Sequence, residues 1–195
     1  MMIIIKLAAI FVVSYLVGSL NFAIIYSIML HSDIRTKGSG NAGATNVLRT
    51  YGKFPALIVF LLDMLKGYLT VRITIYCFGY NASIIASSLG VVLGHDFPVF
   101  FDFMGGKGVS TSFAVILAFM PETAIMALCI FIVILIMTRY VSLSSISASL
   151  SVIVISFIAY GINPLSILCG MLGGLCIIMH RGNILRLIAG NERKI

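Results

Sequence analysis

The sequence FPALIVFLLDMLKGYLTVRITIYCF at residues 54–78 is apolar apart from three charged residues, and it is the strongest indication of the architecture. A helix needs about 20 mainly apolar residues to cross a bilayer, and this stretch is long enough. Further apolar segments lie on both sides of it, at residues 2–30, 82–93, 109–120, 123–138, 141–160 and 165–179. We therefore predict an all-α, polytopic membrane protein in which seven transmembrane helices form a single domain over residues 1–195.

The composition supports this prediction. The chain is 61% hydrophobic and 10% charged, whereas an ordinary soluble domain is about 45–50% apolar and about 25% charged. After seven spans, too few residues remain for a separate soluble domain. The segments 82–93 and 109–120 are the weakest of the predicted spans, because apolar runs of this length also form re-entrant or buried helices.

The basic residues indicate the orientation in the membrane. If all seven segments cross, one side receives Lys6 and the other receives ten basic residues, which lie between Arg35 and Lys194. Cytoplasmic loops are the ones enriched in Lys and Arg, so the N-terminus is predicted outside and the C-terminus inside. This topology accounts for the net charge of +7 without a nucleic-acid partner. The polar stretches 32–53, 94–108, 139–145 and 180–194 then share the cytoplasmic face, where we expect the active-site loops.

The first polar loop, residues 32–53, contains DIRTKGSGNAGATNVLRTYGK from position 33. Its glycines match G-x-G-x-x-G, but that fingerprint requires a preceding strand, and both flanks here are apolar helices. Glycines nevertheless let backbone N–H groups turn toward an anion, and a guanidinium such as Arg49 suits phosphate. Neutral donors accompany it at Ser39, Asn41, Thr45 and Asn46. The alternative is a flexible basic loop that only enforces topology.

The second polar loop, residues 94–108, reads GHDFPVFFDFMGGKG. It is not a Walker A loop, because Phe101 stands where that motif needs glycine. Gly105, Gly106 and Lys107 still precede a predicted helix start, and a helix N-terminus together with a lysine favours an anion. The phenylalanines of this loop are expected at the membrane interface, either as ordinary anchors or against an acyl chain.

Two further patterns carry polar chemistry. His180, Asn183 and Arg186 in the tail, residues 180–194, follow one another at intervals of three, which places them on roughly one helical face. The alternative is an amphipathic basic tail on anionic lipid. Asp63 and Lys66 are three residues apart within a span, and we interpret them as a structural pair facing the bundle interior. The four cysteines show no zinc spacing, so we expect neither a metal site nor a cofactor.

Three stretches together resemble the PlsY family of bacterial acyl-phosphate-dependent glycerol-3-phosphate acyltransferases. They are DIRxxGSGNxGATNxxRxxGK at 33–53, GHxFPVFxxFxGGKGV at 94–109 and HRxNIxRLxxGxE at 180–192, with DMLKG at 63–67 and SLSSI at 142–146. The chain departs from the expected pattern at Asn21 and Ala42, where proline is expected, and at Asp102, where glycine is expected. An acid at position 102 either weakens an anion site or points to solvent.

The resemblance implies a seven-helix enzyme of the bacterial plasma (inner) membrane. It would transfer a fatty acyl group from acyl phosphate to glycerol 3-phosphate, releasing lysophosphatidic acid and phosphate for phospholipid biosynthesis. The resemblance further implies partners in the two substrates, the lipid bilayer and the enzyme that produces the acyl phosphate. The implied catalytic residues are Ser39, Arg49, Lys107 and His180, and the implied substrate-binding residues are Asn41, Thr45, Asn46, Gly105, Gly106, Ser142, Asn183 and Arg186. Either His180 or the leaving phosphate takes the proton.

Two other classes compete with this interpretation. A transporter or exchanger of an organic phosphate would place polar groups at the bilayer midplane and show an internal repeat. A noncatalytic scaffold would not need the combination of Arg49, Lys107 and His180. The polar residues gather at one face and no repeat is evident, which favours an enzyme. The H-x-x-x-x-D pattern typical of acyltransferases that use acyl-CoA or acyl carrier protein does not occur at any of the three histidines.

Overall fold

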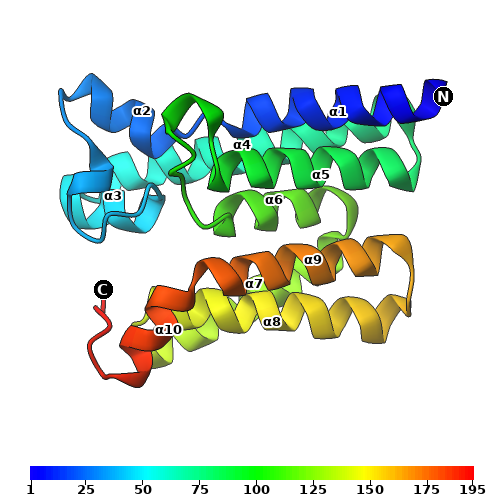
Figure 1. Cartoon of the computed structure of the whole chain (residues 1–195). Coiled ribbons are helices and arrows are strands. Elements are labelled where there is room, and N and C mark those ends of the chain that lie inside the picture. The colour runs from blue at the N-terminus through cyan, green and yellow to red at the C-terminus, as the bar shows by residue number, and fades with distance from the viewer. The chain divides into compact units, whose positions relative to one another are not determined.

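The computed structural model describes residues 1–195 and consists of helices joined by short loops (Figure 1). The helices are α1 (Met2–Gly18), α2 (Phe22–Met29), η1 (Ile34–Thr36), α3 (Ala44–Tyr51), α4 (Lys53–Phe78), α5 (Asn81–Asp96), η2 (Val99–Phe101), α6 (Val109–Phe119), α7 (Pro121–Thr138), α8 (Val141–Tyr160), α9 (Pro164–Met179) and α10 (Arg181–Ile188). The predicted all-α class is confirmed. Helix α8 coincides with the predicted segment 141–160, and α4, α7 and α9 begin and end within two residues of the predicted limits.

The chain forms two compact units, residues 1–118 and 119–195. In the first unit, α1 runs along α5 and both contact α4 (Figure 1). Small residues permit this close approach, because a Cβ on Gly18 would collide with the carbonyl oxygen of Val91, and a Cβ on Gly94 with that of Tyr15. In the second unit, α8 packs between α7 and α9, and α10 continues α9 after a bend of 56°.

The first predicted span is interrupted at residues 19–21, although it contains no proline. Asn21 is buried and caps α2, since its Oδ1 accepts from the backbone N–H groups of Ala23 and Ile24, both at 3.1 Å. Its Nδ2 donates to the carbonyl oxygen of Ala42 at 3.1 Å. The two positions where proline was expected, 21 and 42, are thus joined by a hydrogen bond, and this contact ties the break in the span to the first polar loop.

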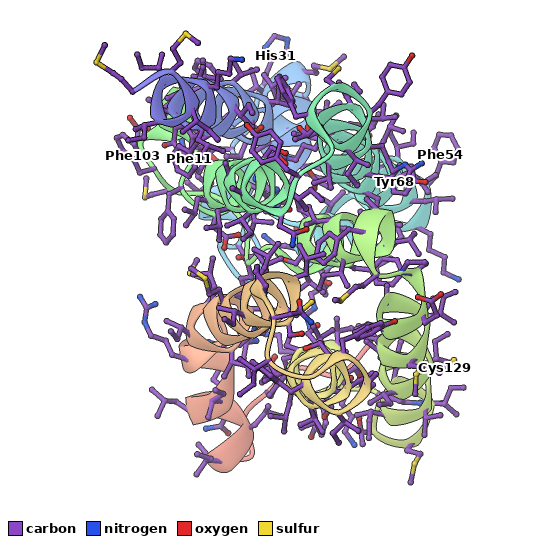
Figure 2. All side chains as sticks on the ribbon, turned by 90° about the vertical axis from the view of Figure 1, so that its right-hand side faces the viewer. Phe11, His31, Phe54, Tyr68, Phe103 and Cys129 are labelled. Carbon is purple, nitrogen blue, oxygen red and sulfur yellow. The ribbon has the colours of Figure 1, made fainter.

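Five segments are long and apolar enough to cross a membrane: 2–29, 53–78, 81–101, 121–138 and 141–160. The bent pair α9 and α10 adds a sixth candidate if the two helices are counted as one span, while α6 has 11 residues and is short for a complete crossing. Large apolar side chains cover the outer sides of these helices, as Phe54 and Tyr76 illustrate. Phe54 and Cys129 point away from their helices in Figure 2. The count of seven spans remains a prediction.

Candidate active site

Asn46 organises the first polar loop. Its Nδ2 donates to the carbonyl oxygens of Ile34 at 3.1 Å and Lys37 at 2.9 Å, and its Oδ1 accepts from the N–H of Ser39 at 2.9 Å. Between these contacts the backbone turns through Gly38 at φ +59 and Gly40 at φ +74, which a glycine adopts without strain. Both N–H bonds of the Asn46 amide are therefore used inside the loop, so Asn46 shapes the loop and is not the free donor that the sequence predicted.

The remaining predicted residues of this loop lie around the start of α3. Ser39 is exposed, and Asn41 and Thr45 are half-buried. Arg49 lies one turn after Thr45 on α3, which places the two side chains on the same helical face. The loop therefore brings a hydroxyl group and a guanidinium together on one side of a short helix.

The second polar loop is held against the end of α5. The N–H of Gly105 donates to the carbonyl oxygen of Asp96 and that of Gly106 to the carbonyl oxygen of His95, both at 3.1 Å. These two glycine N–H groups are thus used in positioning the loop and are not free to bind an anion, in contrast to the sequence prediction. The chain then passes Lys107 and turns at Gly108, with φ +67, into α6. The N–H groups of the first turn of α6 have no acceptor within the helix.

Arg35 joins the two polar loops within the first unit. It forms an ion pair with Asp33 at 2.9 Å, and its Nη1 donates to the carbonyl oxygen of Phe101 at 2.9 Å. Asp102 lies 3.5 Å from the same Nη1, with 78% of its side chain exposed. Hydrogen bonding to Arg35 lowers the pKa of Asp33, and the same contact raises the pKa of Arg35. Asp102 thus faces both Arg35 and solvent.

The predicted pair of Asp63 and Lys66 is confirmed and contains a third member. Lys66 Nζ lies 2.8 Å from Asp63 Oδ1, and both residues are buried. His95 Nδ1 lies 3.1 Å from Lys66 Nζ and 3.4 Å from Asp63 Oδ1. We refer to these three residues as the buried ionic cluster. The sequence did not signal that His95 joins it, because the contact connects α4 with α5.

In the second unit, Glu192 is the centre of the polar residues. Its Oε1 accepts from Ser142 Oγ at 3.0 Å and Asn183 Nδ2 at 2.7 Å, and its Oε2 accepts from Arg186 Nε at 2.8 Å. Its side chain is 4% exposed. Desolvation raises the pKa of Glu192, but the hydrogen bonds from Asn183, Arg186 and Ser142 outweigh it and lower the pKa overall. Three predicted substrate-binding residues are therefore oriented by an acid to which the sequence analysis gave no role.

His180 lies at the bend between α9 and α10. It is buried, and its Nδ1 lies 2.8 Å from the carbonyl oxygen of Cys176. A carbonyl oxygen only accepts, so Nδ1 carries the proton and Nε2 of the neutral ring carries the lone pair. This is the tautomer that can accept a proton through Nε2.

The predicted site residues thus fall into two groups. The first unit holds Ser39, Asn41, Thr45, Asn46, Arg49, Gly105, Gly106 and Lys107, and the second unit holds Ser142, His180, Asn183 and Arg186. No three His, Cys, Asp or Glu side chains are gathered in a way that could hold a metal ion. Fold and polar clusters define a class of protein: a helical, multi-pass membrane protein with basic, glycine-rich loops at its helix ends.

Comparison with known proteins identifies the family. The sequence model of a family described as glycerol-3-phosphate acyltransferase matches residues 8–190. A glycerol-3-phosphate acyltransferase of Thermoanaerobacter sp. (strain X514) is 42% identical over 185 residues, which cover 94% of this chain and 93% of that protein. One from Aquifex aeolicus (strain VF5) is 41% identical over 183 residues, covering 93% and 95%.

Solved structures agree with the sequence relatives. The glycerol 3-phosphate form of PlsY, an integral membrane glycerol 3-phosphate acyltransferase, superposes with a TM-score of 0.92 at 38% identity, covering 97% of this chain and 96% of that one. Its lysophosphatidic acid form gives a TM-score of 0.89 at 37% identity, covering 97% and 95%. The chain belongs to the glycerol-3-phosphate acyltransferase family and is of the PlsY type. These findings support the acyltransferase interpretation and not the transporter.

Proposed function

We propose that the protein transfers a fatty acyl group from acyl phosphate to glycerol 3-phosphate. The hydroxyl oxygen at position 1 of glycerol 3-phosphate attacks the acyl carbonyl carbon, and a new ester C–O bond forms. The bond between the acyl carbon and the phosphate oxygen breaks, inorganic phosphate leaves, and the product is 1-acyl-glycerol 3-phosphate. Because the acyl group is already activated, catalysis requires mainly positioning and charge neutralisation.

Charge neutralisation is the task of the first unit in this proposal. Both substrates carry a phosphate, and like charges repel when they approach in a site of low dielectric. The cations Arg49 and Lys107, the hydroxyl of Ser39 and the first N–H groups of α6 supply the opposing charge and hydrogen bonds. The Arg35 bridge, which joins both loops, supports their joint action.

Binding and orientation involve the other predicted residues. Asn41 and Thr45 donate to a phosphate, whereas Asn46, Gly105 and Gly106 keep the two loops in shape through the hydrogen bonds described above. In the second unit, Asn183 binds glycerol 3-phosphate, and Ser142 and Arg186 line its binding site. Glu192 holds these three side chains in place.

The hydroxyl proton has two candidate acceptors. His180 Nε2 carries the lone pair and can act as a general base, which the Nδ1 contact with Cys176 supports. The leaving phosphate can take the proton instead. In His180→Gln, loss of a general base would lower kcat and remove its dependence on an acid-side ionisation, whereas a pure binding role would raise KM and leave the pH profile of kcat unchanged.

The membrane arrangement that we propose has seven spans, with α6 as a short one, in a single domain of the bacterial plasma (inner) membrane. The N-terminus is outside, and the loops with the site residues face the cytoplasm. Partners are glycerol 3-phosphate, acyl phosphate, the lipid bilayer and the enzyme that supplies the acyl phosphate. No nucleic acid, metal or cofactor takes part.

The observation that carries this proposal is the family match over residues 8–190 together with a PlsY fold of TM-score 0.92. The test uses the purified protein in detergent with palmitoyl phosphate and glycerol 3-phosphate, and palmitoyl-CoA as the parallel donor. We expect lysophosphatidic acid and inorganic phosphate in equal amounts when the donor is palmitoyl phosphate, and no product with palmitoyl-CoA. Product formation should also require glycerol 3-phosphate. Product formation from palmitoyl-CoA alone would overturn the proposed donor.

A further inference from the structure

The buried ionic cluster has no part in the reaction as proposed, although all three of its side chains are ionisable. Asp63 is 0% exposed, Lys66 7% and His95 2%. Ionisable residues inside membrane spans are costly, and they usually mark a function. Stability alone does not explain them, because well-packed apolar residues of similar volume often replace a buried ion pair without loss.

Lys66 connects three parts of the first unit. Besides Asp63, its Nζ contacts the carbonyl oxygens of Gly18 at 3.1 Å and Leu20 at 2.7 Å, where α1 ends. It also lies 3.1 Å from His95 Nδ1. His95 Nδ1 also lies 3.4 Å from Asp63 Oδ1, so this edge of the ring faces both members of the ion pair. The cluster therefore determines the orientation of the His95 ring.

The opposite edge of the His95 ring lies against the second polar loop. A Cβ on Gly106 would collide with His95 Nε2 and would lie 3.0 Å from both Cδ2 and Cε1. The backbone completes this contact, since the N–H of Gly106 donates to the carbonyl oxygen of His95 at 3.1 Å. One side of the ring thus contacts Lys66, and the other contacts the residue that precedes Lys107.

We propose that the buried ionic cluster positions the loop that carries Lys107, and through it the start of α6, for phosphate binding, with His95 and Lys66 as positioning residues. Lys66 orients the imidazole, and the imidazole supports the backbone of Gly106 and hence the place of Lys107. The cluster acts through the loop and does not contact substrate. This inference rests on the proposed role of Lys107 and the first turn of α6 as a phosphate site.

Two substitutions of His95 separate the two edges of its ring. Asn at this position still places an amide beside Lys66 and Asp63 but is too short to reach Gly106, whereas Gln extends an amide toward the Nε2 position. We expect His95→Asn to raise KM for one of the two phosphate substrates by about 10-fold to 100-fold, the scale on which misplaced supporting groups act. His95→Gln should restore KM to within about threefold of the wild type, because its amide again supports Gly106. A threefold change in KM corresponds to about 0.6 kcal/mol.

The control is Ser87→Ala, because Ser87 is buried on the same helix and its hydroxyl donates to the carbonyl oxygen of Ile84, away from the loop. We expect it to leave both KM values unchanged. Lys66→Met should act like His95→Asn, and the double variant should be no worse than the stronger single variant, since both act on one unit. If Lys66→Met does not accumulate, the two His95 variants decide the result.

The experiment measures kcat, KM for glycerol 3-phosphate, KM for palmitoyl phosphate and Tm in detergent for each variant. The substrate whose KM rises in the His95→Asn variant is the one whose phosphate group the loop binds. Gly106→Ala tests the loop itself: if neither KM changes in that variant, the phosphate role of the loop falls, and this inference with it. If Gly106→Ala raises a KM but His95→Asn lowers only Tm or has no effect, the loop role stands and the positioning role is overturned.

Discussion

Glu192 accepts hydrogen bonds from three side chains that were predicted to bind substrate. Two donors, Asn183 and Arg186, come from α10, and the third, Ser142, comes from the first turn of α8. A single carboxylate thereby sets the side-chain orientation on two helices. Hydrogen bonds to a charged group are worth about 1.5–3 kcal/mol each, so this residue matters for stability as well as orientation.

We expect Glu192→Gln to destabilise the protein by about 1–3 kcal/mol, because the amide keeps the size but loses the charge and one acceptor. Thermal unfolding in detergent, followed by intrinsic fluorescence, measures the change. Glu122→Gln is the matched control, since Glu122 accepts one exposed contact from Tyr160 at 3.3 Å. Equal Tm values for both variants would contradict the central role of Glu192.

The lowered pKa of Glu192 predicts an acid-sensitive second unit. Its folded-state pKa lies below the ordinary value of 4.5, so the ionised carboxylate stabilises the fold above pH 4.5. This stabilisation is lost as the pH falls through the lower folded-state value. Unfolding measured between neutral pH and pH 3 should show a decline in Tm below about pH 4.5. The decline in Tm should be smaller in Glu192→Gln. If the variant and the wild type declined equally, other acidic residues would be responsible for the acid sensitivity.

Arg49 and Lys107 are expected to carry the phosphate charge. We expect Arg49→Ala and Lys107→Ala each to lower kcat/KM at least about 100-fold, the usual effect of removing one group that stabilises developing charge. The readout is phosphate release from palmitoyl phosphate in the presence of glycerol 3-phosphate. The control is Lys53→Ala, which removes an exposed cation at the end of the first polar loop and should retain activity. Near-normal turnover in either site variant, with an unchanged Tm, would remove that residue from the site.

At the scale of elements, the packing of α1 on α5 depends on glycines. Gly18 and Gly94 lie where the two backbones approach most closely, and a side chain there would meet backbone atoms that cannot move aside. The same close approach brings the end of α1 near the second polar loop, where the N–H of Val99 donates to Ser19 Oγ at 3.3 Å. Helix packing and loop position are therefore coupled.

We expect Gly94→Ala to destabilise the first unit by about 1–3 kcal/mol or more, the usual cost of overpacking a core. The added Cβ would lie 2.8 Å from the backbone nitrogen of Ser19 and collide with the carbonyl oxygen of Tyr15. Gly174→Ala is the control, because nothing lies within 4 Å of its Cβ position. Alanine at that site should stabilise α9 by up to about 1 kcal/mol. Tm values that fall in the opposite order would contradict the packing argument.

At the scale of the whole molecule, the number of spans determines on which side each terminus lies. An odd number places the termini on opposite sides, and an even number places them on the same side. Length and composition give five candidate spans, or six with the bent pair α9 and α10 counted as one, and α6 then decides whether there is a seventh. The basic residues favour a cytoplasmic C-terminus.

Reporter fusions test this arrangement in bacterial cells. A fluorescent protein that matures only in the cytoplasm should be bright at the C-terminus and dark at the N-terminus. Alkaline phosphatase, active only outside, should show the reverse. The expected pattern follows from seven spans with the basic loops inside. Fluorescence at both termini would show an even number of spans and remove α6 as a crossing.

Much of the fold was predictable from local sequence. The ends of α4, α7, α8 and α9 match the apolar segments, because crossing a bilayer requires a long apolar run, and such a run is visible without tertiary contacts. The break at residues 19–21 was not predicted. It depends on Asn21, whose contact with Ala42 comes from a distant part of the chain.

Consecutive residues were sufficient to predict the helical class, the candidate spans and the positions of the basic, glycine-rich loops, because these are local properties of the chain. Which polar groups meet depends on the folded structure. His95 joins Lys66, Arg35 joins the two loops, and Glu192 collects its three donors through contacts between separate elements. The same contacts show that Asn46, Gly105 and Gly106 hold the loops in shape. The physical reason is that a hydrogen bond depends on the distance between atoms in space, which their spacing along the chain does not fix.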